Sequence, residues 1–274
     1  MRSFLLSIRP TFLPIVIVSI TIILAFSIAA IFNMFFDVHQ LEANTELSSA
    51  VYQVLGTVYA ILLTFTLWGV WQNFNEATDS AQNEASALVD LVHIVEASGS
   101  WKEIKIREAS LSYLQLVVDK EWPVLQNITN DFLNMSEKTH SSSVNIVRVV
   151  QSIVPQNPRE VAIFSQSLTL LNSWLDARRK RILIARGDSA KSLWPLLITG
   201  AFVLFAFHGL FVAKTVGIWA SLLFGFSLTI GLTFYLIFSL DCPFAGTLSI
   251  DSEPFQLAIN ILKSQKSSVD VTKL

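Results

Sequence analysis

The fold is decided by two stretches without Asp, Glu, Lys or Arg: SLWPLLITGAFVLFAFHGLFVA, residues 192–213, and TVGIWASLLFGFSLTIGLTFYLIFSL, residues 215–240. Two more such stretches, residues 11–36 and 50–74, come earlier in the chain. Each of the four holds 22 to 26 residues, and a helix needs about 20 apolar residues to cross the hydrocarbon core. Because backbone groups in lipid must bond within their own segment, we predict four transmembrane helices.

The overall composition supports this prediction. Of the 274 residues, 52% are hydrophobic and only 15% are charged, whereas a soluble domain carries about 25% charged residues. A single water-soluble globule is therefore excluded, and we expect a multi-pass integral membrane protein that also contacts lipid. The formal net charge of −2 gives no indication of a nucleic-acid partner.

The orientation follows from the positions of Lys and Arg, which gather on the cytoplasmic side of membrane proteins. Residues 37–49, between the first two predicted helices, contain neither, and the third and fourth helices are separated by the single residue Lys214. Arg2 and Arg9 precede the first helix, and a basic cluster precedes the third. We therefore expect both chain ends and the long central segment to lie in the cytoplasm.

The predicted fold class is all-α, with four transmembrane helices and a cytoplasmic helical bundle inserted between helices 2 and 3. The expected divisions are residues 1–74 for transmembrane helices 1 and 2, 75–191 for the bundle, 192–240 for transmembrane helices 3 and 4, and 241–274 for a cytoplasmic C-terminal tail.

The first part of the bundle is predicted to continue transmembrane helix 2. No Gly or Pro occurs between Gly69 and Gly99, so this helix can run on as one rod to about residue 97. A capping box at Ser100 should start the next helix. That helix should end near Trp122, because Pro123 disfavours helix at the residue before it.

The rest of the bundle is predicted to contain shorter helices before a final long one. A weaker helix over residues 124–138 is followed by an expected loop at residues 141–143. The last helix should begin after Asn157, because an Asn cap, Pro158 at the first position and Glu160 at the third agree.

The sequence indicates no enzyme. The four histidines show no metal-ligand spacing, there is no glycine-rich phosphate loop, and Cys242 is the single cysteine. We therefore expect no catalytic residue, no cofactor and no metal. A calcium site made of Asp241, Asp251 and Glu253 is a weaker alternative.

A polar stripe marks transmembrane helix 2 as a candidate pore helix. Gln53, Thr57, Ile61 and Thr64 share one face of the helix. In a symmetric ring of subunits this face would line a pore with amide and hydroxyl donors, which solvate an anion. The alternative is that small and polar residues on this helix simply pack against other helices.

Several ionisable residues are candidates for other roles. His208, at membrane depth, is either a gate or anion contact, or a packing histidine. The cluster at residues 176–181 anchors the chain to anionic lipid, contributes buried ion pairs, or concentrates anions at an inner pore mouth. Arg178 with Glu84, and Asp241 with an arginine of the cluster, are the pairs we consider; the structural ion-pair candidates are Glu84, Asp176, Arg178, Arg181 and Asp241.

Three elements resemble the bestrophin-like family of mostly bacterial membrane proteins. They are residues 71–77 with 84–88, residues 176–181 with Trp194, and above all the element after transmembrane helix 4. That last element is the most specific, and its motif residues are Pro243, Phe244, Gly246, Pro254 and Phe255. The resemblance covers residues 52–255.

The resemblance implies a homo-oligomeric anion channel of the chloride type whose second transmembrane helix lines the pore. Bestrophins proper, which are more distant, are typically pentameric. The resemblance also places the chain in a bacterial inner membrane and makes inorganic anions its partners. No dense acidic cluster follows residue 240, so it does not imply a calcium clasp. The alternative is a non-conducting, membrane-anchored helical scaffold or sensor whose bundle binds a partner or anionic lipid.

Overall fold

The structure is a computed structural model that describes residues 12–35, 45–97, 102–127, 132–185, 192–211, 215–246 and 248–271. Regular structure within these ranges is entirely helical, and no strand occurs in them. The predicted all-α fold is therefore confirmed for this part of the chain. Contacts divide the chain into two compact units: unit 1 comprises Met1–Phe74 and Asp188–Cys242, and unit 2 comprises Asn75–Gly187 and Pro243–Leu274.

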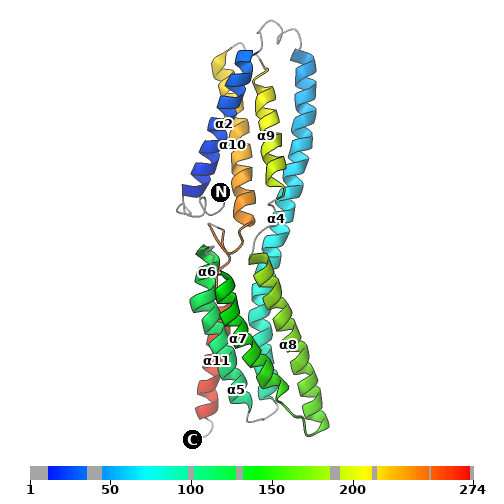
Figure 1. Ribbon diagram of the computed structural model, residues 1–274, viewed down its shortest axis with the longest axis vertical. Helices are drawn as coiled ribbons and strands as arrows, with labels where there is room; N and C mark the ends of the chain where they lie inside the picture. The colour runs from blue at the N-terminus through cyan, green and yellow to red at the C-terminus, as the bar shows by residue number, and fades with distance from the viewer. Residues whose placement is uncertain are drawn as a thin grey trace. The chain divides into compact units, whose positions relative to one another are not determined.

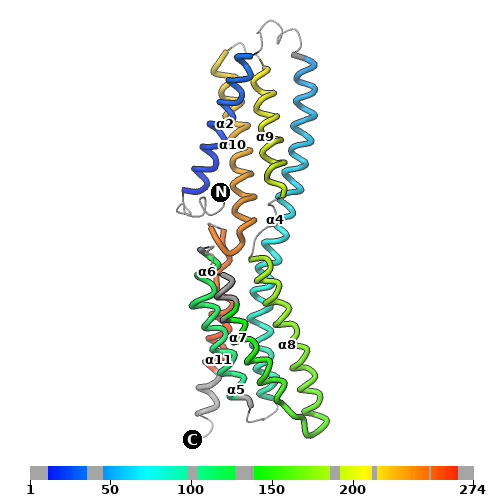
Figure 2. The backbone as a smooth tube through the Cα atoms, in the orientation of Figure 1, coloured from blue at the N-terminus to red at the C-terminus, as the bar shows by residue number. Residues whose placement is uncertain are grey.

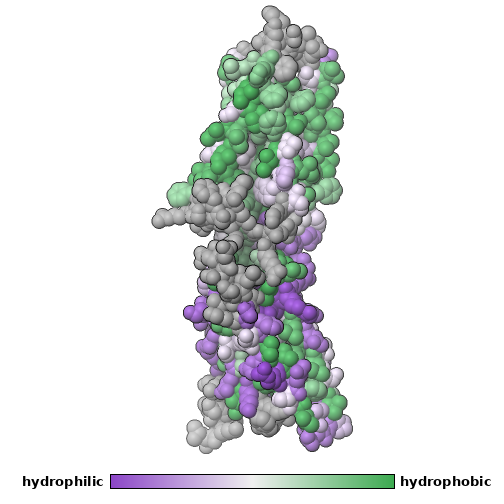
Figure 3. Space-filling model, viewed as in Figure 1, coloured by the Kyte–Doolittle hydropathy of each residue, from purple (hydrophilic) through white to green (hydrophobic). Residues whose placement is uncertain are grey.

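Unit 1 is built from α2 (Leu13–Phe35), the N-terminal part of α4 (Thr45–Glu96), α9 (Trp194–His208) and α10 (Val216–Leu240). These segments run side by side (Figure 1). By length and composition α2, α4 and α10 can each cross a membrane, and α9 is a shorter apolar helix. Hydrophobic side chains cover much of the visible face of these helices (Figure 3), as expected of surfaces that meet lipid.

The helix α9 is shorter than the predicted third span. Its 15 residues reach about 22 Å at 1.5 Å per residue, less than the roughly 30 Å of a hydrocarbon core. Beyond His208 the chain tightens into i→i−3 turns, because Leu210 donates to Phe207 O and Phe211 to His208 O. The remaining residues of the predicted span, 212 and 213, lie outside the described residues.

The core of unit 1 joins all four of its helices through small and aromatic side chains. Tyr59 of α4 is buried, and its hydroxyl donates to the carbonyl oxygen of Leu197 in α9 at 2.9 Å. The ring of Tyr59 lies against Gly200, one turn further along α9. Ala25, Ala29, Ala201, Leu204, Phe205, Leu223 and Ile230 complete the cluster.

Unit 2 contains the rest of α4 with α5 (Lys102–Leu116), η2 (Val117–Glu121), α6 (Trp122–Asn127), α7 (Phe132–Gln151), α8 (Pro158–Ala185) and α11 (Glu253–Val271). Figure 2 shows the path of the backbone through these helices. The prediction that α4 continues as one rod is confirmed, since it runs unbroken for 52 residues. Its buried seam in unit 2 comprises Ala81, Ala85, Leu88, Val92 and Val95.

The structure corrects the predicted end of the second bundle helix. The chain remains helical past Trp122 by changing to a π-helical turn, η2, before α6. The N–H of Trp122 donates to the carbonyl oxygen of Val117, five residues back. Pro123 lacks an N–H and would clash with the carbonyl four residues earlier in a regular α-helix. The wider turn accommodates the proline without ending the helix.

The predicted loop at residues 141–143 is also wrong, because α7 runs through it. Ser143 is buried, and its hydroxyl donates to His140 O at 2.7 Å. Ser141 donates to Glu137 O at 3.2 Å. These serines bond to their own helix instead of breaking it.

The predicted start of the last bundle helix is confirmed. The N–H of Glu160 donates to Asn157 Oδ1 at 2.9 Å, and Glu160 Oε2 accepts from the N–H of Gln156 at 2.7 Å. This reciprocal pair satisfies backbone donors that have no partner inside the helix. The proposed cap at Ser100 lies outside the described residues.

We predict that Gly200→Ala destabilises unit 1. An added Cβ would lie 2.5 Å from the Tyr59 ring, and overpacking of this kind costs about 1–3 kcal/mol, more than the roughly 1 kcal/mol gained in helix propensity. Thermal unfolding in detergent should therefore begin a few degrees lower. Gly225→Ala is the control, because nothing lies within 4 Å of its Cβ. An equal effect of both substitutions would contradict the prediction, and Tyr59→Leu should rescue Gly200→Ala.

Candidate functional site

The predicted pore face of α4 is left uncovered by the rest of unit 1. Gln53, Thr57 and Thr64 are exposed, and Ile61 is 51% exposed. Tyr59 on the other side of the helix is buried. The four predicted residues therefore share a face that the described residues of unit 1 leave uncovered.

The threonine hydroxyls on this face are bonded to their own helix. Thr57 Oγ1 donates to Gln53 O, and Thr64 Oγ1 donates to Ala60 O, both at 2.8 Å. Each hydroxyl thus presents oxygen lone pairs outward instead of a proton. This differs from the expectation that both threonines supply donors to an anion. Of the four predicted residues, only Gln53 offers a side-chain donor outward, through its amide group.

A second exposed stripe on α4 consists of large apolar side chains. Val54, Val58 and Phe65 are 62%, 60% and 72% exposed, with Ile61 and Trp68 continuing the row. At 100° per residue, Val54, Val58 and Phe65 lie roughly 100° around the helix from the polar residues, and Ile61 lies between the two rows. Sequence reasoning missed the apolar stripe, although its 4-3-4-3 spacing is the signal of a packing seam.

His208 lies away from this uncovered face, inside unit 1. It is 7% exposed and its ring is surrounded by Tyr52, Phe211 and Trp219, with centroids 5.8 to 6.2 Å away. These surroundings are apolar and aromatic, as is typical of a histidine that packs between helices. A role as a gate or anion contact stays a prediction.

Unit 2 encloses a buried ion cluster centred on Arg181 of α8. The side chains of Arg181, Glu84 and Glu121 are all fully buried. Arg181 Nε lies 2.6 Å from Glu84 Oε2, its NH2 group donates to Glu84 Oε1 at 3.1 Å, and its NH1 group lies 2.6 Å from Glu121 Oε1. The cluster therefore connects α8 to both α4 and η2.

Polar and aromatic neighbours complete the cluster. The hydroxyl of Tyr113 donates to Glu84 Oε1, and Arg178 donates to Thr139 Oγ1 at 3.0 Å. The Arg181 guanidinium lies 5.6 Å from the Trp122 ring and 5.4 Å from the Phe255 ring. Two arginines thus face two glutamates in an enclosed site, where charges must be paired to avoid a large desolvation cost.

The surroundings shift the pKa values of Glu121, Arg181 and Tyr113. Burial alone would raise the pKa of Glu121, but the charge of Arg181 and a hydrogen bond from Thr139 outweigh it and bring this pKa below its ordinary value. Burial likewise opposes the charge on Arg181, yet Glu84 and Glu121 hold its pKa well above the usual range. Burial first, and then Glu84, raises the pKa of Tyr113. The Glu121 carboxylate and the Arg181 guanidinium therefore stay charged while the phenol of Tyr113 stays neutral.

The structure alters the predicted pairing within this region. We expected Arg178 beside Glu84, but Arg181 occupies that position, and Arg178 bonds to Thr139. A helix turn is 3.6 residues, so these two arginines lie on nearly the same face of α8. Spacing alone could not decide between them. Glu121 was missed because nothing in the sequence marks a π-helical turn that directs it inward.

The remaining ion-pair candidates have different surroundings. Asp176 is exposed and accepts a hydrogen bond from Arg179, and surface pairs of this kind contribute little. Asp241 is buried at the end of α10, where its backbone N–H donates to Ile237 O at 3.0 Å. The pairing of Asp241 with the basic cluster stays a prediction.

The motif residues after α10 form a compact turn followed by α11. Gly246 has a φ of 97°, which a residue with a side chain rarely adopts. The N–H of Ile250 donates to Pro243 O at 2.8 Å and closes the turn. Phe244 and Phe255 are buried, whereas Pro254, at the second position of α11, is half-buried.

The described residues include no group of three or more His, Cys, Asp and Glu side chains that could hold a metal ion. The weaker calcium alternative at Asp241, Asp251 and Glu253 therefore has no support in this part of the chain.

The helices able to span a membrane and the all-helical fold define an integral membrane protein. Residues 15–255 match the Bestrophin-like domain family, so the chain belongs to that family. The predicted resemblance is thereby confirmed.

Solved structures show the same fold at low sequence identity. Two variants of a bacterial bestrophin homologue from Klebsiella pneumoniae superpose with TM-scores of 0.60 and 0.59 at 15% and 14% identity. The first match covers 95% of this chain and 99% of the other, and the second 92% and 96%. A membrane protein variant matches with a TM-score of 0.61 at 14% identity, covering 90% and 96%. No curated protein sequence matches the chain.

We predict that Arg181→Met strongly destabilises the protein whereas Arg179→Met does not. Removing Arg181 leaves two buried carboxylates unpaired, a loss of about 3–5 kcal/mol. Arg179 is exposed, and exposed pairs contribute about 0–1 kcal/mol. Thermal unfolding of the purified chain in detergent measures the difference. Adding Glu84→Gln and Glu121→Gln to Arg181→Met should restore part of the stability; equal melting of both single variants would refute this account.

Proposed function

We propose that this chain is a homo-oligomeric, anion-selective channel of the chloride type in which α4 lines the pore. The observation that carries this proposal is the uncovered face of α4, where Gln53, Thr57 and Thr64 lie exposed beside an apolar stripe. In a ring of copies, neighbouring subunits would cover the apolar stripe, and the water of the pore would contact the polar stripe. Membership of the bestrophin-like family supports the same conclusion.

In the proposed topology α2, the first part of α4, α9 and α10 cross a bacterial inner membrane. Unit 2 and both chain ends lie in the cytoplasm, and the assembly is a pentamer. The absence of Lys and Arg from residues 37–49 and the basic cluster before α9 support this orientation. We assign the chain no enzymatic activity.

The side chains on α4 suggest how such a pore would treat ions. The Gln53 amide can donate to an anion, and the threonine hydroxyl oxygens can contact water. Further along α4, in unit 2, Asp79 and Asp90 are exposed. These carboxylates would repel anions and attract cations wherever they border the conduction path. Ion selectivity must therefore be measured together with conduction.

The alternative is a non-conducting helical scaffold or sensor. It is favoured by the threonine hydroxyls, which bond to their own helix, and by the spacing of the apolar stripe. Both features are expected of a helix that packs against another helix. In that case no water would contact the face of α4 that carries Gln53, Thr57 and Thr64.

We predict that the purified oligomer in liposomes conducts chloride and that a KCl gradient gives a reversal potential near the chloride equilibrium value. Gln53→Glu should lower the chloride flux several-fold, because a ring of carboxylates repels anions. Gln166→Glu is the matched control, since Gln166 is exposed on α8 and not on the proposed pore helix. Absence of flux would favour the scaffold, and a reversal potential near the potassium value would exclude anion selectivity.

We further predict that the face of α4 is hydrated. In a Cys242→Ala background, cysteines at Thr57 and Thr64 should react with small water-soluble thiol reagents, because both positions are exposed. A cysteine at Leu63 should stay protected, because Leu63 packs against the core of unit 1. The rate of labelling in membranes measures the difference. Equal protection at all three positions would contradict a water-filled pore.

A further inference from the structure

Within unit 2, Trp122 contacts the segment between α10 and α11 and also the start of α11. The indole Nε1 donates to the carbonyl oxygen of Ile250 at 3.3 Å. The indole ring lies edge-on to Phe244, with centroids 5.5 Å apart, and tilted against Phe255 of α11, with centroids 5.3 Å apart. Trp122 is 2% exposed, so its side chain is buried.

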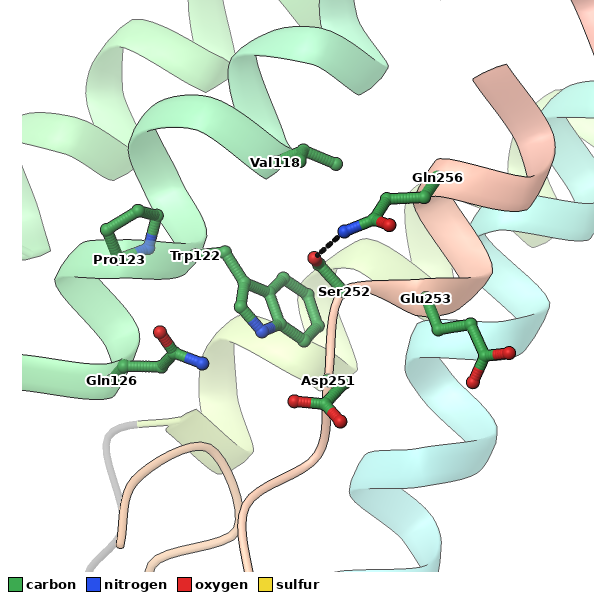
Figure 4. A pocket seen from close by; sticks show the side chains of 8 residues that line it. All are labelled: Val118, Trp122, Pro123, Gln126, Asp251, Ser252, Glu253 and Gln256. Carbon is green, nitrogen blue, oxygen red and sulfur yellow. Dashed lines mark hydrogen bonds between the residues drawn. The ribbon is translucent and has the colours of Figure 1, made fainter. Parts of the chain in front are cut away.

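An open groove lies beside this contact. The groove has a volume of about 360 Å³. In Figure 4 the indole of Trp122 lies between Pro123 and Gln126 on one side and Asp251 and Ser252 on the other. Gln256 donates to Ser252 Oγ at 2.9 Å and so belongs to the wall formed by the segment and the start of α11. Trp122 therefore contacts both walls of the groove.

The position of Trp122 depends on the π-helical turn and on the buried ion cluster. Glu121, the residue before it, is fully buried and lies 2.6 Å from Arg181. The N–H of Trp122 bonds to Val117 O across the wide turn. The Arg181 guanidinium faces both Trp122 and Phe255. A change in the Glu121–Arg181 pair would therefore reach Trp122 directly.

We propose that Trp122 is a latch that fastens residues 243–252 to unit 2, and that the Glu121–Arg181 ion pair keeps this latch closed. The turn after α10 is closed by its own hydrogen bond from Ile250 to Pro243, so it can leave Trp122 without unfolding.

This latch gives a role to three features that the proposed pore does not use. The π-helical turn directs Glu121 inward and places Trp122 beside the segment. The fully buried charges of Arg181 and Glu121 act on the latch in addition to stabilising the bundle. The motif residues Phe244 and Phe255 supply the aromatic surfaces that Trp122 contacts.

We test the proposal by hydrogen exchange on the full chain in detergent, a measurement that does not depend on conduction. Trp122→Leu should raise the exchange rate of the backbone amides in residues 248–256 about tenfold, because local opening of this segment becomes easier. Exchange in α5 and α8 should stay unchanged. Trp122→Phe, which keeps a ring but loses the Nε1 donor, should give a smaller increase.

Two further variants test the proposal, one by removing the ion pair and one by trimming the ring that Trp122 contacts. Glu121→Gln should also raise exchange in residues 248–256, because it removes the ion pair with Arg181. If that variant does not fold, Phe244→Leu, which trims the partner of Trp122 without touching the charges, should give the same local increase.

The matched control is Trp174→Phe, because Trp174 is a fully buried tryptophan of the same unit that packs against Tyr113. It should raise exchange in α5 and α8 but not in residues 248–256. Unchanged exchange in residues 248–256 after Trp122→Leu would overturn the proposal. So would an increase that is equal across the whole of unit 2.

Discussion

The rest of unit 2 depends on the requirement that the charge of Arg181 be neutralised inside the protein. A guanidinium removed from water loses several kcal/mol of hydration, and only well-placed carboxylates offset this loss. Glu84 on α4 and Glu121 on η2 satisfy the requirement from two directions. Because each partner sits on a different element, the charges fix the rotation of α8 against both α4 and η2. Apolar packing alone would tolerate several rotations of such helices.

The sequence predicted helices well wherever one physical signal dominated. The charge-free stretches predicted α2 and α10, and the absence of Gly and Pro after Gly69 predicted the length of α4. Asn157 and Glu160 predicted the start of α8 because a capping box satisfies specific backbone donors. The predicted helix ends were wrong where a residue is compatible with two local structures. Ser141 and Ser143 can end a helix or bond back to it, and Pro123 can end a helix or sit behind a π-helical turn. Tertiary packing decides between such alternatives, and local sequence does not record it.

The candidate site was less predictable than the fold. Hydropathy identifies α4 as membrane-spanning, but it cannot say which side of the helix faces its own unit. The polar stripe was found because Gln53, Thr57 and Thr64 stand out from an apolar background. The adjacent apolar stripe was missed because Val54, Val58 and Phe65 look like any lipid-facing residues. The partner of Glu84 was equally ambiguous, since Arg178 and Arg181 lie on nearly one face of α8.

One helix, α4, contributes both to the uncovered face in unit 1 and to the buried ion cluster in unit 2. The helix is 52 residues long, about 78 Å at 1.5 Å per residue, and it contributes to both units. In unit 1 it is held by Tyr59 and Val70 and leaves a wide face open; in unit 2 it is held by Glu84 and an apolar seam. Each part of α4 is therefore oriented by contacts within its own unit. The Tyr59–Leu197 hydrogen bond and the apolar contacts of Val70 determine which side of α4 is buried in unit 1, and the Glu84–Arg181 pair determines which side faces α8 in unit 2.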